Sequence, residues 1–164
     1  MQIFSWLPAW LGGGQSSSNQ VAKSGKPSKP VIFHFETIET KHLGVIRRPV
    51  AQVEFWSPEF KEWQTHTMLI DTGADYTILP MYMAGMLGLD MSKADTIQTN
   101  GIEGARKTSF LEGVQVRMGK HLRTIPVGIA HTSRIPPLMG RHLFFETFHT
   151  IFEGSDKIVF SEQK

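Results

Sequence analysis

Residues 68–80 read MLIDTGADYTILP, in which one aspartate stands between two apolar runs. Apolar runs of this length predict two strands, joined here by a short loop that begins at Asp71. Burying a lone ionised aspartate costs several kcal/mol unless its carboxylate is hydrogen-bonded or shares a proton with a partner. The small neighbours Thr72, Gly73 and Ala74 leave room for another group to approach the backbone. The stretch therefore indicates a functional carboxylate.

Short strands are predicted on both sides of this loop. Alternating apolar and polar residues predict strands over 31–37 and 50–56, and further strands are predicted over 63–70, 94–99, 107–118 and 121–130. Residues 100–104, NGIEG, lie between two of these runs, and Asn-Gly in that position is a strong hairpin signal. A change of period over 80–89 predicts a short helix that begins at Pro80 and stops near Gly88.

The C-terminal part predicts a second short helix and a hairpin. Residues 136–144 read PPLMGRHLF, and the spacing of Leu143, Phe144 and Phe148 predicts a helix over 141–148. The runs 150–152 and 157–160 flank the turn-like residues 153–156, which predicts a terminal β-hairpin. Frequent Gly and Pro and many short runs together favour a β-rich domain.

Three of these segments resemble one protein family. Residues 69–75, LIDTGAD, are similar to the active-site loop of retropepsin-like (retroviral-type) aspartic proteases. Residues 136–144 resemble the apolar-apolar-Gly-Arg segment that opens the family's C-terminal helix, and residues 100–104 stand where the family has its glycine-rich flap. The resemblance covers the chain from about residue 29 onward. It implies an all-β fold, a small closed β-barrel with one or two short helices, assembled as a homodimer.

The resemblance also implies roles for single residues. Asp71 would be catalytic, Thr72 would lock the loops of two subunits together, and Gly73 would admit the substrate backbone. Asp75 would bind the substrate main chain and pair with Arg141. The resemblance further places Ala74 in the substrate-binding loop, Gly140 beside Arg141 as a support of that loop, and Asn100, Gly101, Ile102, Glu103 and Gly104 in the flap. It implies no metal and no cofactor.

The chemistry of such a site requires two carboxylates. One must be ionised to take a proton from water, and the other must be protonated to polarise the carbonyl, as happens when two carboxylates lie within hydrogen-bonding distance. The chain has only one Asp-Thr-Gly, because Asp90, Asp95 and Asp156 lack both the small neighbours and the apolar approach. The second carboxylate would therefore come from Asp71 of another copy, and a monomer should be inactive.

Composition excludes several other classes of function. The net charge of +2 is spread along the chain, which argues against a nucleic-acid partner. There are no cysteines, so disulfides and cysteine nucleophiles are excluded. The chain has neither a His-Glu-x-x-His motif nor a Gly-x-Ser-x-Gly motif, which argues against a metalloprotease or a serine hydrolase.

The domain predicted over 30–164 follows a different kind of segment in residues 1–29. Residues 1–11 are apolar but too short to span a bilayer, and they lack the pattern of a secretory signal, so we expect a cytoplasmic protein. A weak membrane contact through this tail stays open as an alternative to a loosely ordered tail. The Gly/Ser/Lys/Pro-rich segment that follows predicts a flexible linker and a candidate site of self-cleavage.

The sequence thus predicts an aspartic endopeptidase that cleaves extended peptides with apolar side chains near the cut, with an acid-shifted optimum. The alternative is the same fold used without catalysis, as a dimerisation or peptide-binding module.

Overall fold

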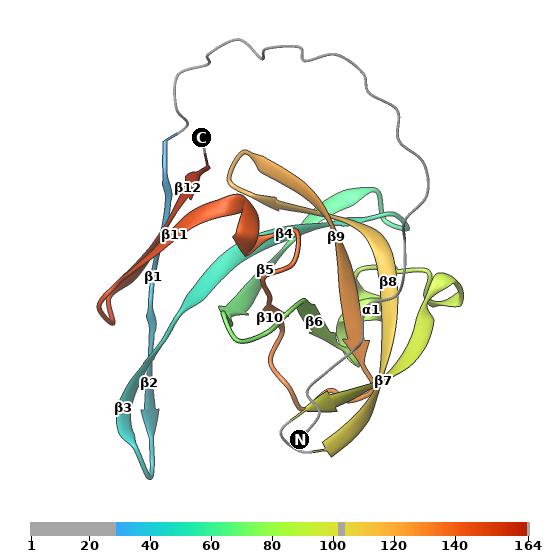
Figure 1. Cartoon of the computed structure of the whole chain (residues 1–164), viewed down its shortest axis with the longest axis horizontal. Helices are drawn as coiled ribbons and strands as arrows, with labels where there is room; N and C mark the ends of the chain where they lie inside the picture. The colour runs from blue at the N-terminus through green and yellow to red at the C-terminus, as the bar shows by residue number, and fades with distance from the viewer. Residues whose placement is uncertain (1–28, 102–103, 164) are drawn as a thin grey trace, which may run out of the picture.

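A closed barrel forms the centre of the computed structural model, which describes residues 29–101 and 104–163. Within these residues six strands pair in a ring, which closes where β4 pairs with β8 through Glu54–Arg117 and Phe55–Val116 (Figure 1). In order around the ring they are β4 (Val50–Ser57), β5 (Glu62–Ile70), β10 (Leu138–Met139), β6 (Thr77–Pro80), β9 (His121–Ala130) and β8 (Gly104–Met118). The predicted all-β class and closed barrel are confirmed.

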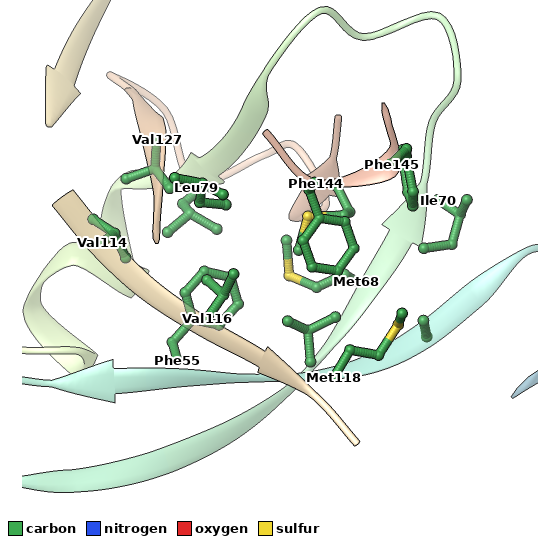
Figure 2. Packing of buried hydrophobic residues seen from close by; sticks show 14 of the residues in the cluster. Phe55, Met68, Ile70, Leu79, Val114, Val116, Met118, Val127, Phe144 and Phe145 are labelled. Carbon is green, nitrogen blue, oxygen red and sulfur yellow. The ribbon is translucent and has the colours of Figure 1, made fainter. Parts of the chain in front are cut away.

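Alternation of side chains explains why these strands form a barrel. Along β4, Ala51, Val53 and Phe55 are buried, while the residues between them are exposed or half-buried. Successive residues of a strand point to opposite faces, so one face of β4 lines the interior. Figure 2 shows Phe55, Val116, Met68 and Phe144 gathered in this interior, where all four are fully buried. The burial of such side chains is the main source of the barrel's stability.

A separate three-stranded sheet, called here the terminal sheet, packs beside the barrel. It has the order β1 (Val31–His34), β12 (Lys157–Glu162), β11 (Phe148–Glu153), and all its pairs are antiparallel. Phe160 of β12 is fully buried, and its ring stacks on Phe145 at a centroid distance of 5.8 Å. The predicted terminal hairpin is therefore present as β11 and β12, and strand β1 is added at its edge.

Two hairpins extend beyond these sheets. Strand β7 (Asp95–Gly101) lies outside the ring and pairs with β8 as far as Gly101–Gly104, in line with the hairpin predicted around residues 100–104. Strands β2 (Glu36–Thr40) and β3 (Gly44–Arg48) form a two-stranded sheet of their own, which the sequence did not predict. The strand predicted over 31–37 was correspondingly wrong in its extent, because the chain leaves one strand at Phe35 and enters another.

Helices are few and short in the described part of the chain. The helix predicted over 80–89 is present as α1 (Met81–Met86), with Pro80 as its N-cap. The helix predicted over 141–148 was wrong, because this segment forms a turn followed by the 3₁₀ helix η2 (Phe145–Thr147). Leu143 has a φ of 56°, a left-handed conformation that interrupts any helix there. A further 3₁₀ turn, η1 (Met91–Lys93), precedes β7.

Candidate active site

Asp71 directly follows β5, and it begins a tight turn. Its backbone carbonyl accepts a hydrogen bond from the Ala74 N–H at 3.2 Å, and its Oδ1 accepts one from the Gly73 N–H at 2.9 Å. A Cβ at position 73 would lie 3.2 Å from the same oxygen, which explains why glycine suits this position. Asp71 itself is half-buried, so its carboxylate is held by the backbone while one side remains open. Residues 71–75 are called the Asp71 loop below.

The strand that leads into the Asp71 loop is tied to the β10 segment and to the chain before β4. The Leu69 N–H donates to the Pro137 carbonyl at 2.9 Å, and the Asp71 N–H donates to the Met139 carbonyl at 3.1 Å. On the other side, the Ile70 N–H donates to the Pro49 carbonyl at 2.8 Å. Two separate backbone segments, at Pro49 and at 137–139, therefore fix the point at which the chain enters the loop.

The segment after β10 holds the far end of the loop. The Arg141 N–H donates to the Ala74 carbonyl at 3.0 Å, and the His142 N–H donates to the Asp75 carbonyl at 2.8 Å. The Arg141 guanidinium also donates to the Asp75 carboxylate. Both side chains are more than half exposed, and such surface pairs contribute little to stability. The pair therefore matters for the position of these two side chains rather than for the free energy of unfolding.

Gly140 is in closer contact with the loop than the sequence indicated. A Cβ at position 140 would lie 2.3 Å from the backbone carbon and oxygen of Tyr76, so only glycine fits without displacing the chain. The Gly140 N–H donates to the Thr77 hydroxyl at 3.3 Å, and that hydroxyl lies 3.0 Å from the Met139 sulfur. Thr77 is fully buried, and no signal in the sequence identified it as part of this arrangement.

A cavity of about 680 Å³ lies beside the Asp71 loop. Thr72, Asp75 and Arg141 are among its polar residues, and the rings of Tyr76, Phe145 and Phe148 are among its apolar walls. The Tyr76 ring contacts Phe110 at a centroid distance of 4.4 Å and crosses Gly128, where a Cβ would lie 2.8 Å from the ring. Glycine at 128 thus makes space for Tyr76, which the sequence did not indicate as a residue of the site.

The structure brings together some of the residues that the sequence singled out. Asp71, Thr72, Gly73, Ala74 and Asp75 form one loop, and Gly140 and Arg141 lie against it. The backbone of Asn100, Gly101 and Gly104 belongs to the β7–β8 hairpin, which takes no part in the contacts of the loop given above. Ile102 and Glu103 lie outside the described residues, as do the predicted tail, linker and membrane contact in residues 1–28.

The described residues show neither a metal cluster nor a spanning helix. Among them, no three His, Asp or Glu side chains are grouped so that they could bind a metal ion. Across residues 29–101 and 104–163, no helix has the length and apolar character needed to cross a bilayer.

Comparison with known proteins identifies the family. No curated protein matches the chain. A family model described as aspartyl protease matches residues 59–143, just over half of the chain. The matched range contains the Asp71 loop, β6 to β10 and the Gly140–Arg141 pair of residues that supports the loop. The chain therefore belongs to the aspartyl protease family, of the retropepsin-like type.

Proposed function

We propose that this protein is an aspartic endopeptidase whose active site contains Asp71 from each of two copies of the chain. The observation that supports this most is the Asp71 loop, a half-buried carboxylate fixed by backbone hydrogen bonds at the end of a barrel strand. Within the whole sequence only one Asp-Thr-Gly occurs, so a pair of equivalent carboxylates requires a second copy.

The two carboxylates would have different roles in hydrolysis. When they lie within hydrogen-bonding distance, repulsion between like charges keeps one of them protonated while the other is ionised. The ionised Asp71 takes a proton from a water molecule, and that water attacks the peptide carbonyl, which the protonated Asp71 polarises. The two titrations then belong to the pair rather than to one residue. Activity should accordingly be highest at acid pH.

The substrate would be an extended peptide. Asp75, whose carboxylate is paired with Arg141, lies four residues from Asp71 in the same loop and would bind the main chain of the peptide. Gly73 leaves the space above the Asp71 oxygen open to a backbone. Apolar side chains near the cut would suit a cleft of this family, and the β7–β8 hairpin would serve as the flap that covers it.

The test is the Asp71→Asn variant, which should lose cleavage of a mixed-peptide library. Asp156→Asn is the matched control, because this carboxylate is exposed in the β11–β12 turn. Retained activity in Asp71→Asn would contradict the mechanism.

Mixing experiments test the requirement for two copies. Increasing amounts of the Asp71→Asn chain added to a fixed amount of wild-type chain should lower activity, because mixed dimers contain one carboxylate. Undiminished activity despite subunit exchange would contradict the shared site. If the wild-type protein cleaves no peptide at any concentration, the fold serves as a non-catalytic module.

A further inference from the structure

The hairpin of β2 and β3 is linked to the terminal sheet by a hydrogen bond from the Arg47 guanidinium to the Ser155 carbonyl at 3.3 Å, but it is part of neither larger sheet. Its strands pair with each other and with no other strand in the described residues, and it projects away from the barrel (Figure 1). The Thr40 hydroxyl donates to the Gly44 carbonyl and accepts from the Leu43 N–H, both at 3.0 Å, which fixes the turn. Isolated two-stranded hairpins are at best marginally stable in water. A hairpin of this kind with a well-defined turn therefore indicates that another surface packs against it.

The tip of this hairpin is apolar. Leu43 and Val45 are 74% and 61% exposed, more than any other large hydrophobic residue in the described part of the chain. The two faces of the hairpin differ in exposure. The cross-strand pair Ile38–Ile46 is half-buried on one face, while Val45 is exposed on the other. Exposed apolar residues gathered on a projecting element are typical of a protein–protein contact.

The base of the hairpin lies next to the Asp71 loop. Pro49 follows β3 directly, and its carbonyl accepts the hydrogen bond from the N–H of Ile70, the residue before Asp71. The next residue, Val50, pairs with Leu69. Each strand of the hairpin has five residues, and a strand of that length extends about 17 Å. The tip therefore lies within about 17 Å of Pro49. Pro49 is hydrogen-bonded to Ile70, the residue directly before Asp71.

We propose that this hairpin packs against the second copy of the chain, a contact called the clasp below. The inference rests on the proposed function, because two Asp71 side chains that share a proton bring the partner's loop to the base of the hairpin. An element of this length that starts beside the two-fold axis then runs along the partner's surface. By symmetry the partner's hairpin makes the same contact in the opposite direction.

The cavity beside the partner's own Asp71 loop is the surface that fits the tip. Its lining reaches from Thr72 and Asp75 of the loop to Phe148 and Thr150 of β11, and it does not include Asp71. Its volume of about 680 Å³ is sufficient for the side chains of Leu43 and Val45, and Tyr76 and Phe148 provide apolar walls. Seating the tip there removes apolar area on both sides from water, which favours association.

The test compares variants of the tip with a matched control. Leu43→Asp and Val45→Asp introduce a charge on exposed side chains and leave the barrel core intact. Phe60→Asp is the control, because Phe60 is 52% exposed in the β4–β5 turn, at the end of β5 opposite to Asp71. Dimer dissociation is measured by analytical ultracentrifugation, and peptide cleavage is measured over a range of protein concentrations.

A clasp predicts a weaker dimer whose activity recovers at high concentration. Each tip variant should raise the dimer Kd by about tenfold or more, as expected for a central interface residue. Cleavage per chain should fall at low protein concentration and return to the wild-type value at high concentration, since the Asp71 pair is unchanged. Phe60→Asp should match the wild type in both measurements. An unchanged Kd in both tip variants would overturn the inference.

A photo-crosslinking benzophenone residue at position 43 identifies what the tip contacts. Cross-links between chains that map to the region around Tyr76 and Phe148 support the clasp. Cross-links within one chain, including to residues 1–28, or none at all, overturn it. The outcomes separate the two proposals: an active wild-type dimer with unaffected tip variants defeats the clasp alone, whereas a wild-type protein that is monomeric and inactive at all concentrations defeats both.

Discussion

Replacing Gly140 by alanine should displace the Asp71 loop. The new Cβ would lie 2.3 Å from the Tyr76 backbone carbon and oxygen. Non-bonded carbon atoms in contact are normally about 3.5–4.0 Å apart, so the two segments would have to separate by more than about 1 Å. The obstacle is backbone rather than the end of a flexible side chain, and rotation of a side chain therefore cannot relieve it.

The surrounding hydrogen bonds determine the magnitude of this effect. The segment around Tyr76 is fixed on one side by the bonds from Arg141 to Ala74 and from His142 to Asp75, and on the other by the bond from Gly140 to Thr77. Overpacking typically costs about 1–3 kcal/mol, and we expect the upper end here because relaxation stretches these bonds. Misplacing a reacting group by about 1 Å can lower the rate by about a hundredfold, and we expect a loss of that size in cleavage.

Urea denaturation and peptide cleavage measure the two effects, with Gly85→Ala as the matched control. Gly85 lies in α1, it is exposed, and a Cβ there would meet nothing within 4 Å. The same substitution should therefore raise the free energy of unfolding by about 0.5–1 kcal/mol, the usual gain from alanine in a helix. If Gly140→Ala changed the free energy of unfolding by less than about 0.5 kcal/mol, the tight contact with Tyr76 would be refuted.

The remaining predictions concern the core and the pH dependence of stability. Phe144→Ala should lower the free energy of unfolding by about 3–5 kcal/mol, because Phe144 is fully buried; Leu143→Ala, at an exposed neighbour, should change it far less, and equal losses in urea denaturation would contradict this. Burial lowers the pKa of His121, whose ring packs edge-on against Phe148 at 5.3 Å, from its ordinary value of 6.5. The unfolded chain therefore binds more protons as the pH falls below 6.5, and the folded state loses stability there. His121→Leu should show a smaller loss of stability than the wild type between neutral pH and about pH 5, and an equal loss in both would exclude this contribution.

The barrel could be predicted because its strands follow local rules. In β4 the apolar residues Ala51, Val53 and Phe55 recur at every second position, β5 ends in an apolar run, and a turn separates the two strands, so both are visible without knowledge of their neighbours. Asn100-Gly101 similarly predicted the β7–β8 hairpin. Both residues are paired within its strands, since the pairing continues to Gly101–Gly104. Local patterns of this kind carry over directly from sequence to structure.

The hairpin of β2 and β3 gave no comparable signal. Its turn contains Leu43 and Gly44 rather than an Asn-Gly or Asp-Gly pair, and its strands have few apolar residues, none of which belongs to the core formed by the described residues. Periodicity detects burial, so an element that is exposed within one chain escapes it.

The wrong helix over 141–148 has a cause outside the segment. The N–H groups of Arg141 and His142 are bound to carbonyls of the Asp71 loop, and adjacent Phe144 and Phe145 are both drawn into the core. Tertiary contacts therefore override the local helical spacing. The contact of Gly140 with Tyr76 could not be predicted from the sequence either, because it depends on how two distant segments approach each other.

The pairing of β1 with β12 has a consequence for how the chain acquires its structure. During synthesis β1 emerges long before the strand that it pairs with, so it must wait without a partner while the intervening barrel is made. Contacts between segments so far apart in sequence form slowly, because the long connecting chain must first lose entropy. Completion of the terminal sheet would thus be a late step, and a newly made molecule would reach its mature form only after the barrel has already closed.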